Sequence, residues 1–116
     1  MGHALNGALA GLVGITASAN IMTPEGTILI GAVAGLICTG TTAFLQRCRI
    51  DDAIGVVPVH ACGGVWGTLA FPLLSAPDSW GTGLTVWEQL GIQVLGSTVC
   101  FIWSFGMSFA LLWLIN

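Results

Sequence analysis

Residues 50–70 read IDDAIGVVPVHACGGVWGTLA, and the rest of the interpretation follows from this stretch. Two adjacent acids, Asp51 and Asp52, precede an uncharged apolar run that contains one histidine, His60. An ionisable side chain inside an apolar membrane span is costly, and such residues usually mark a substrate or proton path. We therefore predict that this stretch forms a membrane-spanning helix and that His60 is its working residue.

The composition predicts that lipid is the solvent of this chain. Apolar residues make up 55 % of the 116 residues and charged residues only 6 %, whereas a soluble domain carries about 25 % charge. With two bases against five acids, a nucleic-acid partner is excluded, because binding to phosphates needs many cations. The four cysteines lack the paired spacing of a zinc site. We predict no cofactor, no metal and no enzymatic activity.

Four uncharged segments are long enough to cross a bilayer, which takes about 20 apolar residues. They cover about residues 4–22, 26–45, 53–74 and 89–115. The predicted class is therefore an all-α integral membrane protein. The first segment ends in a more polar stretch with Thr16, Ser18 and Asn20. We expect these side chains to bond to backbone carbonyls or to neighbouring helices.

Small residues recur in the first two segments at four-residue spacing. Gly7 and Gly11 form one such pair, and Gly31 and Gly35 form another. This spacing lets a second helix approach the backbone closely. We therefore predict a packed face on each of these helices.

Two helix starts are marked by side chains suited to capping. Thr23 followed by Pro24 predicts the start of the second helix, since threonine is favoured at the N-cap and proline at the first helical position. Thr85 and Glu88 fit a capping box at the start of the fourth. Within the third segment, Pro58 implies either a kink near residues 54–58 or a regular helix that starts at Pro58.

The only basic residues, Arg47 and Arg49, lie in the short polar loop 46–52. By the positive-inside rule this loop is cytoplasmic, and an even number of spans then places both ends of the chain there. Asp51 and Asp52 can each cap the following helix and favour its dipole. We expect a structural role for Asp51 and leave a structural and a functional role open for Asp52.

The face around His60 is predicted to be free of bulky side chains. Three- and four-residue steps along a helix lead from His60 to Gly63, Gly64 and Gly67. The space beside the ring suits a path for small molecules, but it could equally admit a neighbouring helix. A neutral imidazole has one donor and one acceptor nitrogen, so it can pass a hydrogen bond along a file of small polar molecules. Cys62 faces away from the ring at this spacing, which argues against a metal site or a catalytic pair.

Two runs resemble the ammonium transporter (Amt) family. The run LNGALAGLVGITASA at residues 5–19 resembles the family's eighth transmembrane helix. Residues 50–70, with the paired acids, the histidine and the motif GGVWG, resemble its tenth helix. One apolar helix separates the two runs, as in the family, and the resemblance covers nearly the whole chain.

This resemblance implies a homotrimer of eleven-helix subunits in a lipid bilayer, each with an ammonia path between two inverted halves. His60 matches the second of two pore histidines, and Gly63, Gly64 and Gly67 would be small residues on its pore face. The paired acids match residues at the cytoplasmic start of the helix, with a structural or inner-mouth role. The implied substrate is ammonium or ammonia, and the implied location is the plasma (inner) membrane.

The chain departs from the family pattern in what it lacks. The first pore histidine, the aromatic gate and the outer vestibule belong to earlier helices, and the tail that would meet a PII-type regulator follows Asn116 in the family. We therefore expect a C-terminal fragment covering helices 8 to 11. Two alternatives stay open, a membrane ammonium-sensing module of a signalling protein and a non-conducting fragment.

Overall fold

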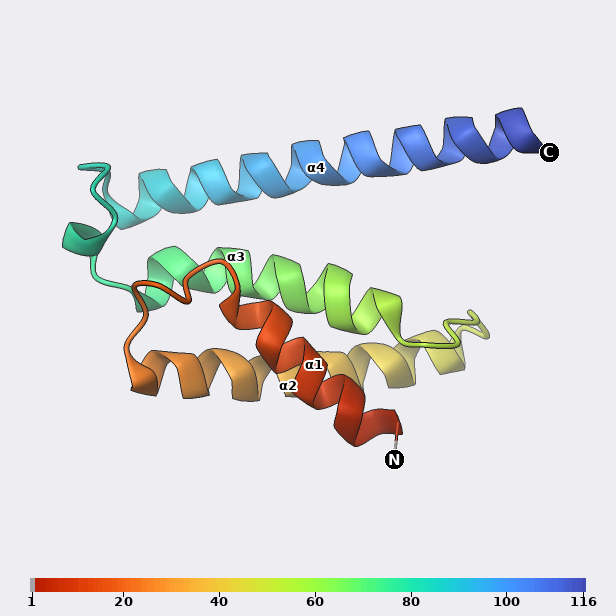
Figure 1. Ribbon diagram of the computed structural model, residues 1–116, viewed down its shortest axis with the longest axis horizontal. Coiled ribbons are helices and arrows are strands. Elements are labelled where there is room, and N and C mark those ends of the chain that lie inside the picture. The colour runs from red at the N-terminus through yellow and green to blue at the C-terminus, as the bar shows by residue number, and fades with distance from the viewer. Residues whose placement is uncertain (1) are drawn as a thin grey trace.

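The computed structural model describes residues 2–116, with side chains from Ala4 onward, and this part of the chain contains helices and turns but no strand (Figure 1). The all-α class predicted from the sequence is confirmed. In chain order the elements are α1 (Gly2–Ile15), α2 (Pro24–Arg47), the π-helix η1 (Val57–Cys62), α3 (Gly63–Leu74), the 3₁₀-helix η2 (Pro77–Ser79) and α4 (Val86–Ile115).

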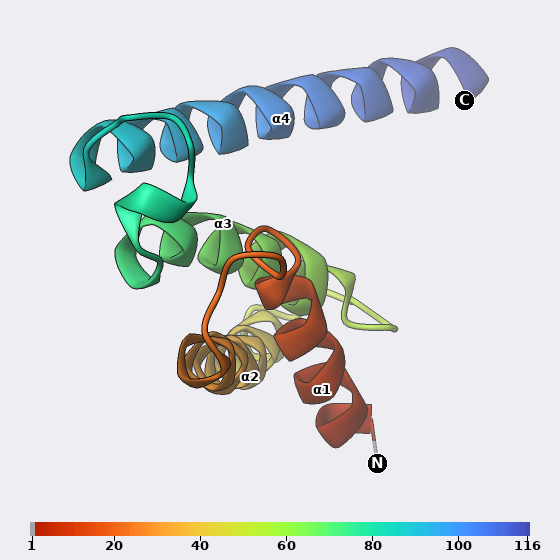
Figure 2. The same ribbon diagram turned by 60° about the vertical axis from the view of Figure 1, so that its left-hand side comes forward.

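The helices form a bundle of α1, α2 and α3, with α4 beside α3. Helix α1 crosses both α2 and α3, α2 packs against η1 and α3, and α4 packs against α3 (Figures 1 and 2). The directions of α2, α3 and α4 alternate along the chain (Figure 1). Small side chains fill the centre of the bundle, which lets its helices lie close together: Ala10, Ala34, Cys38 and Val59 are each at most 2 % exposed.

The glycines of α1 and α2 face one another. A Cβ atom added at Gly11 would lie 3.5 Å from the Cα atom of Gly31, and one added at Gly35 would lie 3.9 Å from the carbonyl oxygen of Gly7. The two small-residue spacings therefore form one shared interface, and the predicted close approach is confirmed.

Helix α1 is shorter than the expected first span over residues 4–22. It ends at Ile15, and turns follow through Ile21. The Thr16 hydroxyl donates a 2.7 Å hydrogen bond to the carbonyl of Val13. Such local bonds compete with the helical ladder. At 14 residues, α1 extends about 21 Å, which is less than the bilayer core of roughly 30 Å.

Three other helices are long and apolar enough to cross a membrane, namely Pro24–Arg47, Val57–Leu74 and Val86–Ile115. The chain is therefore an integral membrane protein. Helix α4 has 30 residues and a length of about 45 Å. It must tilt or extend beyond the hydrocarbon core.

Both predicted helix starts are confirmed. The hydroxyl of Thr23 accepts a hydrogen bond from the backbone N–H of Gly26, and Pro24 begins α2. Thr85 and Glu88 form the reciprocal capping box at the start of α4. These caps satisfy backbone N–H groups that have no partner inside the helix.

The two alternatives for Pro58 are resolved by the start of η1. The chain is in a turn at Ile54, and the regular helix begins beside Pro58. The proline ring therefore does not meet the carbonyl of a preceding helical turn, which is the clash that makes proline break a helix.

Candidate functional site

His60 lies in η1, and the side chain of Asp52 caps the N-terminal end of that helix. One Asp52 carboxylate oxygen accepts a hydrogen bond from the backbone N–H of Val56 and the other from that of Val57, each at 2.9 Å. Bonds to an ionised acceptor are stronger than neutral ones. Gly55, with a φ of 75°, turns the chain into the helix. Asp52 therefore sets where the helix that carries His60 begins.

The turn around His60 is wider than an α-helical turn. Residues Val57–Cys62 form a π-helix, in which hydrogen bonds join residues five apart, and such turns are frequent at functional sites. A π-helical turn contains more residues than an α-helical one. His60 is therefore rotated out of phase with the residues of α3 that follow.

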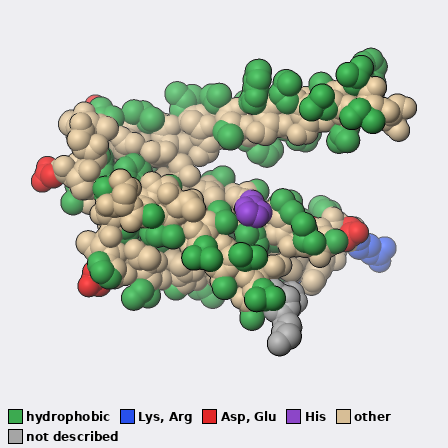
Figure 3. Space-filling model, viewed as in Figure 1, with side chains coloured by type: hydrophobic (Ala, Val, Ile, Leu, Met, Phe, Trp, Pro, Cys, Tyr) green, Lys and Arg blue, Asp and Glu red, His purple; other side chains and the backbone are tan. Residues whose placement is uncertain are grey.

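The ring of His60 opens onto a groove between η1–α3 and α4. The groove has a volume of about 650 Å³, and His60 is exposed. In Figure 3 a histidine side chain, in purple, lies on the visible surface of the molecule. Most of the walls of the groove are apolar. The polar lining consists of His60 and Thr68 on one wall and Gln93, Ser97, Cys100 and Ser104 on the other.

The three glycines expected beside His60 divide between two faces. Gly64 lines the groove with His60. Gly63 and Gly67 are buried against α1, where a Cβ at Gly63 would lie 3.4 Å from the carbonyl oxygen of Ala10. The structure thus differs from the expectation of one common face. The π-turn is the physical reason, because an α-helical count does not hold across it.

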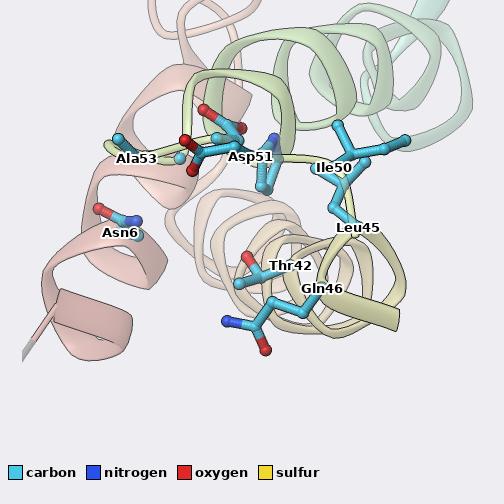
Figure 4. Close-up of a pocket in the computed structure, with 10 residues that line it drawn as sticks. Asn6, Thr42, Leu45, Gln46, Ile50, Asp51 and Ala53 are labelled. Carbon is cyan, nitrogen blue, oxygen red and sulfur yellow. The ribbon is translucent and has the colours of Figure 1, made fainter. Parts of the chain in front are cut away.

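A second cavity, of about 330 Å³, lies on another side of η1 and contains the paired acids in its lining. Asn6 reaches it from α1, and Thr42 and Gln46 reach it from α2 (Figure 4). Asp51 lines this cavity and Asp52 both lines it and caps η1. His60 does not line it. The paired acids therefore lie near Asn6 of α1 and the C-terminal end of α2. His60 lines a different groove.

The groove residues of α4 were not predicted from the sequence. Gln93, Ser97, Cys100 and Ser104 follow one another at steps of four, three and four residues, which places them on one helical face. The sequence spacing alone could have predicted that these four residues share a helical face. It could not have predicted which neighbouring helix that face meets.

Comparison with known proteins points to one family. The family model described as Ammonium Transporter Family matches residues 1–116. A candidate ammonium transporter of Synechocystis sp. is 42 % identical, over 97 % of this chain and 21 % of that protein. Ammonium transporter Amt2 of Archaeoglobus fulgidus is 36 % identical, over 100 % of this chain and 27 % of that protein.

One solved structure, of a protein named Sensor Amt Protein, superposes with a TM-score of 0.84 at 38 % identity. The match covers 91 % of this chain and 27 % of that one. The chain thus spans about a quarter of the length of the relatives it matches.

Proposed function

Since this chain belongs to the ammonium transporter family, we propose that it is the C-terminal part of a protein that moves ammonium or ammonia across a membrane. The observation that carries the proposal is the position of His60. Its ring faces a largely apolar groove from a helix long enough to span a bilayer. Ionisable residues within a membrane-spanning helix usually mark transport pathways.

The chemistry of the groove favours a neutral permeant. A bare ammonium ion would leave its water hydrogen bonds for apolar walls, which is costly. Ammonia carries no charge and can donate to and accept from the two nitrogens of a neutral imidazole. We propose that ammonium gives up its proton before the groove, that ammonia passes His60, and that the proton travels separately along a pair of histidines of which His60 is the second.

The neighbouring residues receive roles that follow from their contacts. Gly64 keeps the groove open beside His60, whereas Gly63 and Gly67 let α1 approach and hold the helix in place. Asp52 positions the start of η1. Asp51 lines the cavity of about 330 Å³, which we place at the inner mouth of the path.

The proposed complete protein is a homotrimer of eleven-helix subunits in the plasma (inner) membrane. The basic residues Arg47 and Arg49 favour a cytoplasmic loop, which places both ends of this chain in the cytoplasm. A PII-type regulator would bind a tail beyond Asn116.

A sensing role is the second candidate, because one structural relative is named Sensor Amt Protein. In a sensor, binding of ammonium in the groove would change an attached signalling domain and no flux would be needed. A kinase or cyclase domain encoded beyond Asn116 supports this role, and a short tail supports transport. A fragment that conducts nothing is the third candidate.

The proposed path is tested by replacing His60 with alanine in the complete protein that carries this chain. Uptake of ammonium into proteoliposomes is measured against uptake of sodium and potassium. We expect the His60→Ala protein to lose selective ammonium uptake, with Val99→Ala on the exposed side of α4 as the control. Selective uptake at the unsubstituted rate would remove His60 from the path.

A further inference from the structure

We infer that Asn6 of α1 is a positioning residue for His60, because its side chain covers the turn from which the histidine-bearing helix starts. This inference rests on the proposed function and adds a residue to it. It starts from Gly55, which is buried and has a φ of 75°. A Cβ atom added at Gly55 would collide with the amide nitrogen of Asn6. The Asn6 side chain therefore lies directly against the Cα atom of Gly55.

The side chain of Asn6 is suited to the surroundings of this turn. Asn6 is the only polar residue among residues 4–15, and an amide is costly to bury in apolar surroundings without hydrogen-bonding groups nearby. It is half-buried and lines the cavity of about 330 Å³ together with Asp51, Asp52 and Gly55 (Figure 4). The cavity thus gives the amide polar surroundings, and the amide gives the turn a contact with α1.

The backbone of Asn6 is held against α2. The buried thiol of Cys38 donates a hydrogen bond to the carbonyl oxygen of Asn6 across 3.6 Å. At the next residue, the carbonyl oxygen of Gly7 lies 3.9 Å from the position of a Cβ atom added at Gly35. Asn6 therefore extends its side chain from a backbone that close contact with α2 fixes in place.

Gly55 is connected to His60 by backbone hydrogen bonds. The carbonyl oxygen of Gly55 accepts a 3.1 Å bond from the N–H of Val59, the residue before His60. The N–H of Gly55 donates to the carbonyl oxygen of Asp52, whose side chain caps the same helix. Gly55 thus lies between the cap and the first helical turn. A shift of Gly55 would move the start of η1 and, with it, the imidazole.

Helix α1 contacts this segment on both sides of His60. Asn6 meets Gly55 before the histidine, and Ala10 meets Gly63 after it, where an added Cβ atom would lie 3.4 Å from the carbonyl oxygen of Ala10. Asn6 and Ala10 are four residues apart and therefore share one face of α1. The contact at Gly63 is made inside a regular helix, whereas the contact at Gly55 is made on a turn. Loss of the Asn6 side chain should therefore loosen the start of η1.

Hydrogen exchange tests this contact without depending on transport. In the complete protein, Asn6→Ala removes the contact, and Leu5→Ala, at a residue of α1 that is 63 % exposed, is the control. The backbone amides of residues 53–59 should exchange at least about threefold faster in Asn6→Ala than in the control, because the start of η1 opens more often. Equal exchange in the two variants overturns the inference.

Transport selectivity tests the link to His60. The ratio of ammonium uptake to potassium uptake does not depend on how much of the protein is folded. A displacement of about 1 Å at a working group can cost about a hundredfold, so we expect Asn6→Ala to lower this ratio at least about twofold. Leu5→Ala should keep the ratio of the unsubstituted protein.

The results for His60→Ala separate this inference from the proposed function. If His60→Ala loses selectivity and Asn6→Ala keeps it, the positioning role is rejected and the path stands. If His60→Ala keeps its selectivity, the path is rejected and the positioning role with it, whereas hydrogen exchange still reports the contact itself.

A double variant tests whether the two residues act on one another. Gly55→Ala places a methyl group where the Asn6 amide lies, and it should lower ammonium uptake. Asn6→Ala vacates that space, so the double variant should take up ammonium at least about twofold faster than Gly55→Ala alone, whereas independent defects would add. The rescue is partial because alanine at this φ is strained in both proteins. If Gly55→Ala fails to fold, recovery of folded protein in the double variant is the same rescue. A double variant no better than Gly55→Ala overturns the inference.

Discussion

Replacing Gly67 with alanine tests the closest approach of two helices in this structure. A Cβ atom at Gly67 would collide with the backbone carbonyl of Gly14 in α1. A backbone carbonyl cannot rotate aside as a long side chain can, so α1 and α3 must move apart. Overpacking of this kind costs about 1–3 kcal/mol. Alanine offsets about 1 kcal/mol through its higher helix propensity, which leaves an expected net loss of about 0–2 kcal/mol.

Two other glycines serve as matched controls. A Cβ at Gly64 would meet the side chain of Val13 at 3.8 Å, which is an ordinary contact, and a Cβ at Gly40 in α2 would have no atom within 4 Å. Alanine at either position should be neutral or stabilising by up to about 1 kcal/mol. The predicted difference between Gly67→Ala and Gly40→Ala is therefore about 1–3 kcal/mol.

The free energy of unfolding is measured by titrating the purified complete protein in detergent with sodium dodecyl sulfate. Tryptophan fluorescence reports the transition, and Trp66 lies next to the substituted residue. If Gly67→Ala unfolds at the same denaturant fraction as Gly40→Ala, α1 and α3 are not in backbone contact, and the placement of Gly63 and Gly67 away from the groove loses its support.

Two further predictions use the same titration. Asp52→Ala removes the cap of η1 and should cost about 1–2 kcal/mol, whereas Asp51→Ala, an exposed residue outside that cap, should cost much less; equal losses would contradict the capping role. Trp66→Phe removes the 3.1 Å bond from the indole N–H to the carbonyl of Ile30 and should cost about 0.5–1.5 kcal/mol, while Trp103→Phe on the exposed side of α4 should cost less. A larger loss at Trp103 would show that the bond between α3 and α2 contributes little.

Local chemistry was predictable because it depends on neighbours in the chain. The caps at Thr23 and Thr85 each join residues three apart, so the residue types at that spacing were enough. The glycine spacing of α1 and α2 predicted a packed face on each helix. That Gly11 meets Gly31 was left open, because either face could have met a different partner.

The end of α1 was less predictable. Hydropathy continues past Ile15, and the helix stops where Thr16 and its successors bond to nearby carbonyls. Polar side chains late in an apolar run can either follow the helix or end it. The choice depends on the packing of the chain that follows.

Composition, hydropathy and motif spacing were sufficient for an apolar helical protein, the cap residues and His60 as the residue to test. The tertiary structure assigned the glycines of this helix to different neighbours: Gly64 to the groove beside His60, and Gly67 to α1. The physical reason is rotational phase. One π-helical turn shifts every later residue around the helix axis, and contacts between helices distant in the chain select which rotation is stable.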